Sequence, residues 1–285
     1  MIINANAKLN IYLEVLAKRT DGYHDILSIM VPISIWDKIY LERKGKGIEL
    51  ECDDPSLPQD KRNLAFQAAT LYLNEANIKE GVYIRISKNI PVAAGLGGGS
   101  SDAAAVLKGL NMLYGKLSQS DLLKLAKEIG ADCPFFLYEG PCLAKGIGDM
   151  LEPLPQKLLY FVLITPPVHV STAWVYNQYN SRFGLTKSEQ SSIKMLWEEG
   201  KIKALLKNDL EKVSKKYFPI IDEIKNLLSR QGAKGVLMSG SGPTVFGIFD
   251  SEQESQRAVE HIPAEIGKVF VASSLINKHW GVAKR

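Results

Sequence analysis

The stretch PVAAGLGGGSSDAAA, at residues 91–105, gives the clearest indication of chemistry in the sequence. Glycine adopts positive φ and lets a ligand approach the backbone closely. Ser100 or Ser101 is a preferred N-cap for the alanine-rich helix that we expect to follow. Backbone N–H groups would then converge at the positive end of a helix dipole, which favours an anion. The stretch therefore predicts a phosphate-binding loop, with a flexible turn before a helix as the alternative.

This loop differs from the common nucleotide motifs. A Walker A loop requires GxxxxGK[ST], and a dinucleotide fingerprint requires GxGxxG soon after the first strand, with an acid about 20 residues later. The stretch at residues 91–105 matches neither pattern. These two nucleotide-binding motifs are therefore excluded for this loop.

Two ionisable residues could take part in proton transfer or charge stabilisation. Lys8 lies just before the first expected strand, and Asp132 lies beside Pro134 at the start of an apolar run. A lysine at a strand edge is usually solvated, and an aspartate before such a segment can act simply as its N-cap. These ordinary interpretations stay open for both residues when each is considered alone.

The composition indicates a folded protein that acts on a small molecule. The chain has 285 residues, of which 46% are hydrophobic and 23% are charged, a size that suits one large domain or two ordinary ones. The net charge of +4 is spread along the chain, so nucleic acid is not an expected partner. No apolar run approaches the roughly 20 residues that span a bilayer, so we expect no membrane partner.

The cysteines and histidines show no ligand spacing. The cysteines are an odd set without a CxxC pair, and the N-terminal residues lack the features of an export signal, so we expect a reducing cytoplasm. The histidines form no HExxH pattern, and a zinc site built by the protein is not expected. These residues are Cys52, Cys133, Cys142, His24, His169, His261 and His279.

The elements that must position these residues mix strands and helices without strict alternation. Period-2 patterns predict strands at residues 10–16, 27–35, 38–42 and 82–87. Helices are expected at residues 62–76, from Ser101 to Tyr114, and from a capping box at Ser118 and Asp121 to Gly130.

The second half of the chain begins after Pro153 and Pro155, and we expect the domain boundary near residue 155. Helices are predicted at residues 172–179, 187–197, 201–206, 209–215 and 220–229, and strands at 158–165, 235–238, 244–249 and 269–273. Pattern alone therefore predicts an α+β protein with two domains.

Three segments together resemble the motifs of the GHMP kinases. They are AKLN at residues 7–10, the glycine stretch at 91–105, and MSGSGPTVFGIF at 238–249. The resemblance implies an N-terminal domain of the ribosomal-protein-S5 type, residues 1–155, and a C-terminal ferredoxin-like domain, residues 156–285. It also implies that ATP and the substrate meet in a cleft between these domains.

The resemblance also implies roles for individual residues. Asp132 would be the catalytic base that accepts the proton of the attacking hydroxyl, and Lys8 would keep Asp132 ionised and stabilise the transferring phosphoryl group. Ser101 would contact Mg²⁺. The ATP-binding residues would be Pro91, Ala94, Gly95, Leu96, Gly97, Gly98, Gly99, Ser100 and Ser101, with Asn63 and Lys88 near the adenosine.

The stretch KRTDGYHDILSIM, at residues 18–30, resembles GHMP kinases of the non-mevalonate isoprenoid route, whose alcohol substrate carries a cytidine diphosphate group. Within that family, Tyr23, His24, Thr172 and an aromatic residue that follows Thr172 would bind the substrate at its cytosine end. Tyr176 is the expected aromatic residue and Trp174 is its rival. Asn10 would contact the sugar-alcohol end of the substrate.

Two other functions stay open at this stage. A kinase of another small alcohol, such as homoserine or mevalonate, would explain the three motifs but not the Gly-Tyr-His turn. A binding or regulatory protein that has lost catalysis would not need both Lys8 and Asp132. We therefore expect an enzyme that uses ATP and Mg²⁺ and is a monomer or weak homodimer.

Overall fold

The computed structural model describes residues 1–138, 140–179 and 187–276. The chain divides into two compact units, and each is discontinuous in sequence. Unit 1 comprises Met1–Ala7, Ile35–Val92 and Gly97–Tyr138, and unit 2 comprises Lys8–Ser34, Ala93–Leu96 and Glu139–Arg285. The domain boundary that we expect near residue 155 stays a prediction.

Two long strands contribute residues to both units. They are β1 (Ile2–Lys18) and β2 (His24–Lys44), and β2 continues through the gap between the strands predicted at residues 27–35 and 38–42. In unit 1, residues 38–44 of β2 pair antiparallel with β4 (Gly81–Ser87), which pairs in parallel with β3 (Ile48–Cys52). Buried residues alternate with more exposed ones along these strands, as expected for strands with one face against a core.

The helices of unit 1 are α1 (Leu64–Glu75), α2 (Gly98–Tyr114) and α3 (Gln119–Ile129), followed by the short 3₁₀ helix η1 (Cys133–Leu137). The predicted capping box at the start of α3 is confirmed, because Ser118 and Asp121 exchange both bonds. Gly130 ends α3, as the sequence indicates, and Gly115 in the left-handed conformation ends α2 after Tyr114.

The predicted N-cap of α2 is wrong. The helix begins at Gly98 and its N-cap is Gly97, at φ +74° and without a side-chain cap bond. The hydroxyl of Ser101 donates to the Asn6 carbonyl at 2.7 Å, so it does not cap the helix. A left-handed glycine turns the chain into the helix here, and neither Ser100 nor Ser101 is required as a cap.

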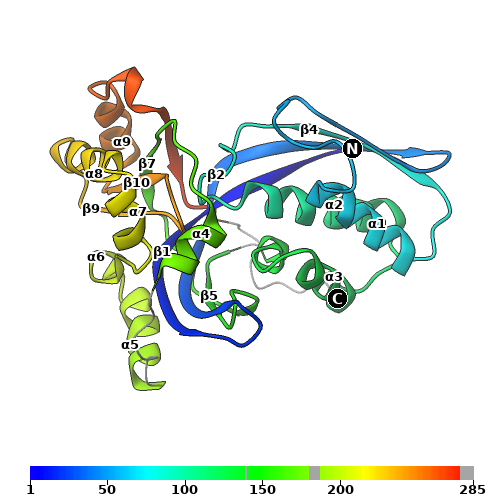
Figure 1. The fold of residues 1–285 in the computed structure, drawn as a ribbon, viewed down its shortest axis with the longest axis horizontal. Coiled ribbons are helices and arrows are strands. Elements are labelled where there is room, and N and C mark those ends of the chain that lie inside the picture. Colours follow the sequence, from blue (N-terminus) through cyan, green and yellow to red (C-terminus); the bar gives the residue numbers. More distant parts are fainter. Residues whose placement is uncertain (139, 180–186, 277–285) are drawn as a thin grey trace. The chain divides into compact units, whose positions relative to one another are not determined.

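Unit 2 contains a four-stranded antiparallel sheet in the order β11-β7-β10-β9. Its strands are β7 (Tyr160–Thr165), β9 (Gly235–Met238), β10 (Val245–Phe249) and β11 (Lys268–Ser273). α8 (Ile220–Arg230) packs on β9 and β10, and α9 (Glu252–Val259) packs on β7, β10 and β11 (Figure 1). All residues of β10 are buried, as expected for a central strand.

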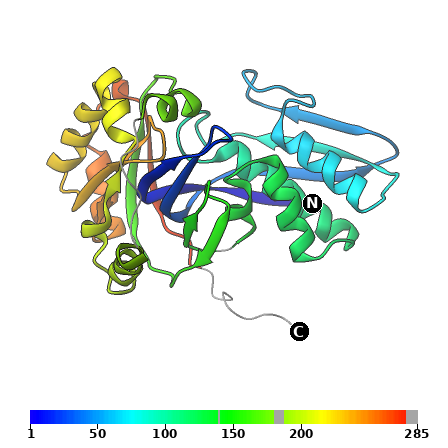
Figure 2. The same cartoon turned by 60° about the horizontal axis from the view of Figure 1, so that its bottom comes forward.

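The remaining elements of unit 2 include four helices, drawn in green and yellow in Figure 1: α4 (Thr172–Gln178), α5 (Lys187–Glu198), α6 (Ile202–Leu205) and α7 (Glu211–Tyr217). β5 (Cys142–Lys145) pairs antiparallel with β2 and with β6 (Met150–Pro153), and η2 (Ala264–Ile266) precedes β11. The same arrangement is visible from a second side in Figure 2.

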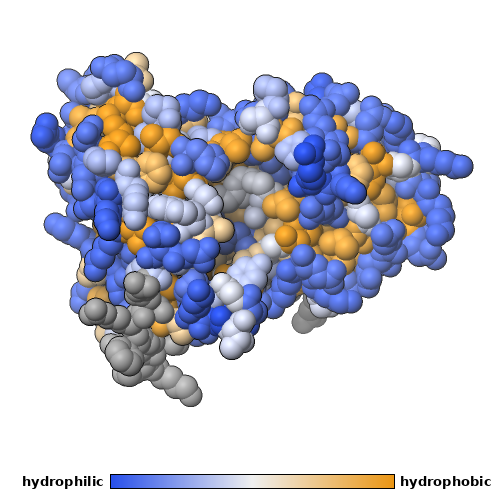
Figure 3. Space-filling view, in the orientation of Figure 1, coloured by the Kyte–Doolittle hydropathy of each residue, from blue (hydrophilic) through white to orange (hydrophobic). Residues whose placement is uncertain are grey.

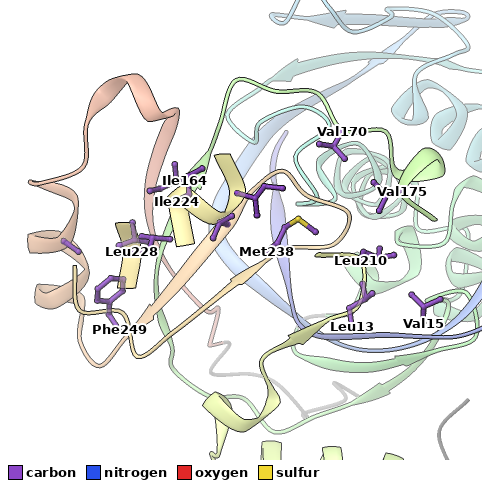
Figure 4. Close-up of a cluster of buried hydrophobic side chains, with 14 of the residues drawn as sticks. Leu13, Val15, Ile164, Val170, Val175, Leu210, Ile224, Leu228, Met238 and Phe249 are labelled. Carbon is purple, nitrogen blue, oxygen red and sulfur yellow. The ribbon is translucent and has the colours of Figure 1, made fainter. Parts of the chain in front are cut away.

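A two-residue strand, β8 (Lys207–Asn208), joins the N-terminal residues of unit 2 to its C-terminal half. It pairs in parallel with β1, with Tyr12 opposite Lys207 and Leu13 opposite Asn208. Leu13 and Leu210 lie in one buried cluster with residues of α8 and of the sheet (Figure 4). Burying a side chain of this size contributes about 1.5–3 kcal/mol, so this cluster fixes β1 firmly to the rest of unit 2.

Figure 3 shows hydrophilic side chains over most of the visible surface, with hydrophobic residues in patches between them. Among the described residues, none of the helices is both long enough and apolar enough to cross a membrane.

Candidate functional site

The glycine loop has a conformation that only some residues can adopt. Gly95 and Gly97 have φ of +75° and +74°. A Cβ on Gly95 would lie 2.2 Å from the Ser239 carbonyl oxygen, a distance at which backbone atoms would have to move. Glycine is therefore required at Gly95 by both the backbone angle and the close approach of another segment.

All three segments that resemble kinase motifs contribute to one group of contacts within unit 2. The Lys8 amide donates to the Leu96 carbonyl at 3.0 Å. The Ser239 hydroxyl donates to the Gly95 carbonyl at 3.0 Å and accepts a long bond of 3.4 Å from the Asn10 amide. The glycine loop is thus held by backbone or hydroxyl bonds to both other segments.

The start of α2 has the features expected of an anion site. The first helical bond runs from the Ser101 amide to the Gly97 carbonyl, at 2.9 Å. The preceding amides, those of Gly98, Gly99 and Ser100, have no carbonyl of the helix to bind. The positive end of the helix dipole adds to this arrangement, so a phosphate would be stabilised there.

Lys8 and Asn10 are buried, with exposed fractions of 5% and 2%. The Lys8 ammonium donates to Asn10 Oδ1 at 2.6 Å, and Asn10 Nδ2 donates to Ser28 Oγ at 2.8 Å. The Ser28 hydroxyl then donates to the Tyr12 carbonyl at 2.6 Å. This chain of bonds orients the ammonium. The alternative interpretation, in which Lys8 is a solvated residue at a strand edge, is therefore wrong.

Asp132 precedes η1, but its carboxylate makes no cap bond to that helix. The alternative interpretation as a capping residue therefore lacks its defining bond. Asp132 belongs to unit 1 and Lys8 to unit 2. Their predicted partnership stays a prediction.

Lys88 is part of a buried group of charges in unit 1. Its ammonium donates to Asp37 Oδ2 at 2.5 Å and to Asp102 Oδ2 at 2.7 Å, and the three side chains are at most 7% exposed. Burial raises the pKa of Asp102 to about 8, against the opposing attraction of Lys88. A neutral Asp102 would leave one carboxylate facing one ammonium, which is the less costly arrangement in a buried site.

Asp37 is not among the residues selected from motifs and spacing, although its position carries a signal in the sequence. It occupies an inward position of β2, with the buried Ile35 and Ile39 two residues away on each side. A charged residue at an inward strand position needs a partner of opposite charge and hydrogen bonds. Asp37 obtains both, because its Oδ1 also accepts from the amides of Asn89 at 2.6 Å and Ile90 at 2.8 Å.

His24 and Tyr176 lie together in unit 2, with ring centroids 5.3 Å apart and a tilt of 32°. His24 is 5% exposed, and its Nε2 has no hydrogen-bond partner among the described residues. Burial lowers the pKa of His24, with a smaller effect from Lys18. The ring is therefore neutral at pH 7, and its Nε2 is available to a ligand.

The other residues expected around the cytosine have different surroundings. Trp174 packs edge-on against Tyr217, with centroids 4.7 Å apart, and is not paired with His24. Tyr23 is 59% exposed, and Thr172 Oγ1 shares a hydrogen bond of 2.8 Å with Ser241 Oγ. Tyr176 is therefore better placed than Trp174 to share a ligand with His24.

The predicted ATP contacts differ in how much of their side chain remains available. Asn63 is the N-cap of α1, with its Oδ1 bound to the Ala65 amide at 2.9 Å and its Nδ2 donating to the Pro58 carbonyl at 2.8 Å. Ala94 and Leu96 are buried, so only their backbone can face a ligand. Pro91 is half-buried. The contacts expected of these residues with ATP stay predictions.

The predicted magnesium ligand, Ser101, has a suitable donor arrangement. Its hydroxyl proton is given to Asn6, which leaves the oxygen lone pairs to accept a cation. Among residues 1–138, 140–179 and 187–276, no group of three or more His, Cys, Asp or Glu residues could hold a metal ion. A cation at Ser101 would thus be held mainly by phosphate oxygens and waters, as Mg²⁺ commonly is.

Comparison with known proteins identifies related sequences. Residues 63–140 match the GHMP kinases N terminal domain, and residues 198–268 match GHMP kinases C terminal. A 4-diphosphocytidyl-2-C-methyl-D-erythritol kinase from Acetivibrio thermocellus is 41% identical over 96% of this chain and 98% of its own length. A protein of the same name from Syntrophotalea carbinolica is 44% identical over 92% of this chain and 94% of its own.

Solved structures show the same fold. A crystal structure of 4-(cytidine 5'-diphospho)-2C-methyl-D-erythritol kinase has a TM-score of 0.83 and 36% identity, covering 96% of this chain and 98% of that one. Methanococcus jannaschii mevalonate kinase has a TM-score of 0.72 at 17% identity, covering 97% of this chain and 98% of that one. The second likeness concerns the fold alone. The predicted two-domain α+β fold is confirmed.

Proposed function

This chain belongs to the GHMP kinase family, and from that premise we propose that it transfers the γ-phosphoryl group of ATP to the 2-hydroxyl of 4-diphosphocytidyl-2-C-methyl-D-erythritol. Relatives of that name match the chain over nearly its full length. The observation that favours this substrate over other small alcohols is the pairing of His24 with Tyr176, since a cytosine offers a π-face and a polar edge.

The triphosphate of ATP would bind at the glycine loop and the start of α2. Phosphoryl transfer relies mainly on positioning and on neutralising charge. The amides of Gly98, Gly99 and Ser100 would supply donors without any movement of a side chain. Ser101 would hold Mg²⁺ in part, and the bound cation would neutralise negative charge on the phosphates.

Asp132 is the proposed general base. It would accept the proton of the attacking 2-hydroxyl, and a positioned base of this kind contributes about 10²–10⁴-fold to the rate. Lys8 would stabilise the negative charge on the transferring phosphoryl group. Its bond to Asn10 fixes the direction of the ammonium before substrate binds.

The cytosine would be bound by His24 and Tyr176. Tyr176 can stack on the base, and stacking of this kind is worth about 1–3 kcal/mol. The Nε2 of His24 is buried without a partner in the described part of the chain, so a hydrogen bond to the base edge would remove the cost of that desolvated atom. Tyr23 would close over the base from its exposed position.

We also propose a reducing cytoplasm as the location and a monomer or weak homodimer as the form. The cysteines support the first part of this proposal, because Cys52, Cys133 and Cys142 are all buried free thiols. Burial raises the pKa of Cys133 and of Cys142 to about 12, so neither thiol is reactive at neutral pH.

One assay tests the substrate. Purified protein is given ATP and Mg²⁺ with 4-diphosphocytidyl-2-C-methyl-D-erythritol, its analogue without the cytidine diphosphate group, homoserine or mevalonate, and ADP release is followed. We expect turnover with the first compound and little with the others. Equal turnover of homoserine or mevalonate would contradict the proposed acceptor, while no turnover of any alcohol would favour a binding protein.

A further inference from the structure

The turn between β9 and β10, residues 239–244, carries Ser239, whose hydroxyl contacts both the glycine loop and Asn10. The position of that hydroxyl depends on the backbone on either side of it. Two carbonyl groups flank Ser239, those of Met238 and Gly240. What these carbonyls bind therefore decides where Ser239 lies.

Both carbonyls bind one side chain, that of Asn208. Its Nδ2 donates to the Met238 carbonyl and to the Gly240 carbonyl, each at 2.7 Å. Its Oδ1 accepts from the Leu210 amide at 3.0 Å, and the residue is 7% exposed. A primary amide has two N–H donors on one nitrogen and an acceptor beside them, and this position uses all three.

Two residues of α7 hold the same region from other directions. The Ser214 hydroxyl, in a fully buried residue, donates to the Ser241 carbonyl at 3.0 Å. Glu211 Oε2 accepts from the Met238 amide at 2.9 Å, while its Oε1 pairs with Lys225. Three side chains outside the recognised segments thus fix the backbone around Ser239.

We propose that Asn208 is a positioning residue for nucleotide binding, which acts by fixing Ser239 so that Ser239 holds Gly95 and the glycine loop in their binding conformation. This inference rests on the proposed function in one respect, that the glycine loop binds ATP. It is independent of which alcohol receives the phosphoryl group. ATP binding without acceptor therefore tests it separately from the substrate assignment.

The test replaces Asn208 by aspartate, Asn208→Asp, which keeps the shape of the side chain. When protonated, the new carboxyl has an O–H that can donate to one of the two carbonyls. When ionised, it has only acceptors facing those carbonyls. Burial and the facing oxygens raise the pKa of the introduced acid, so the donating form is favoured at low pH and is lost as pH rises.

Charged residues surround this position and are present in every variant. Lys207 pairs with Glu14, and Asp209 Oδ2 accepts from the Val15 amide and from Tyr179. Glu211 is the other acid in contact with the turn. The wild type, measured over the same pH range, removes their effects and the titration of ATP itself.

We expect Asn208→Asp to bind Mg²⁺–ATP within a few-fold of wild type at about pH 6 and about tenfold more weakly at about pH 8.5, measured by calorimetry relative to the wild type at each pH. The matched control is Asn111→Asp. Asn111 also donates and accepts through its amide, to and from Leu117, but it lies near the end of α2 and belongs to unit 1. It is expected to change thermal stability without a pH-dependent change in ATP affinity.

A second variant keeps the inference testable if Asn208→Asp does not fold. Ser214→Ala removes only the bond to the Ser241 carbonyl and is expected to weaken ATP binding several-fold, equally at every pH. ATP affinity within twofold of wild type at all pH values, in whichever of the two variants is folded, would overturn the proposal. A loss of melting temperature without a loss of affinity would mean that these side chains serve stability alone.

Discussion

The rings of His24 and Tyr176 face each other at a centroid distance of 5.3 Å, while Trp174 is engaged with Tyr217 at 4.7 Å. The two aromatic residues of α4 that could stack on a cytosine therefore have different neighbours. The sequence leaves open whether Tyr176 or Trp174 stacks on the cytosine. Because the neighbours of these residues differ, their alanine variants can be compared directly.

Tyr176→Ala should raise the KM for the cytidine-bearing substrate by the equivalent of about 1–3 kcal/mol of lost stacking, and leave the KM for ATP nearly unchanged. Trp174→Ala is the matched control from the same helix, and its KM for that substrate should change much less. Steady-state kinetics with each substrate varied in turn measures both. If Trp174→Ala shows the larger effect, the two assignments must be exchanged.

Asp132→Asn should lower kcat by about 10²–10⁴-fold with both substrates still bound, because it preserves the shape and removes the proton acceptor. Lys8→Ala should also lower kcat, and the double variant should be little worse than the poorer single variant, because groups that act as a unit are not additive. Kinetics of the three proteins, with ATP affinity as the control, measures this. A variant Asp132→Asn that keeps more than about a tenth of wild-type kcat would rule out the general-base role.

Gly95→Ala should weaken ATP binding far more than Gly98→Ala. Gly95 has positive φ, and its added Cβ would meet a backbone oxygen at 2.2 Å. At Gly98 the backbone φ is not positive, and the nearest atom is Ile90 Cγ2 at 3.1 Å, which is a side-chain atom and a longer contact. Calorimetry beside a thermal melt separates affinity from stability. Equal ATP affinities of the two folded variants would show that the left-handed turn at Gly95 is not needed for binding.

Asp37→Asn should destabilise the protein more than Asp102→Asn, by about 1–3 kcal/mol in free energy of unfolding. Asp37 accepts from two amides as well as from Lys88, whereas Asp102 Oδ1 has no partner among the residues that the structure describes. Denaturant unfolding of both variants at pH 7 gives the comparison. An equal or larger loss in Asp102→Asn would mean that the charged form of Asp102 is the one that pairs with Lys88.

The same pair of variants gives a pH dependence with a definite sign. The pKa of Asp102 is raised from 3.8 to about 8, so between these values the folded protein binds more protons than the unfolded chain. The free energy of unfolding should therefore fall as pH rises through this window, by at most about 1.4 kcal/mol per pH unit for one group. Asp102→Asn should flatten this decline, and an unchanged profile would contradict the raised pKa.

The sequence predicts most elements that have strong local signals. The strand at β9, the helices α3 and α8, and the capping box at Ser118 all follow from residues within one segment. The start of α2 differs from its prediction because serine capping is a statistical preference, whereas Gly97 provides the turn by backbone conformation. The short strand β8 has no signal in the sequence, because a two-residue strand has no periodicity.

The residues of the candidate site also differ in whether the sequence alone could identify them. Lys8, Gly95 and Ser101 could be selected because they stand in recognisable segments. Asn208 could not, because its role depends on partners far away in sequence, such as the Gly240 carbonyl. Asp102 stands in the glycine stretch, but the pattern of that stretch does not indicate its contact with Lys88. Asp37 is the exception, since an acid at an inward strand position is a signal visible in the sequence itself.

The discontinuity of the two units affects the order in which this protein can fold during its synthesis. Unit 1 is complete once Tyr138 has been made, whereas unit 2 combines Lys8–Ser34 with Glu139–Arg285. Asn10 can contact Ser239 only after a further 229 residues have been made. Leu13 likewise can pair only after β8 has been made. Because domains generally fold as units while the chain emerges, unit 1 should form first on the ribosome. The AKLN segment therefore reaches its final place only near the end of translation, and a chain cut short before β9 would lack a properly held glycine loop.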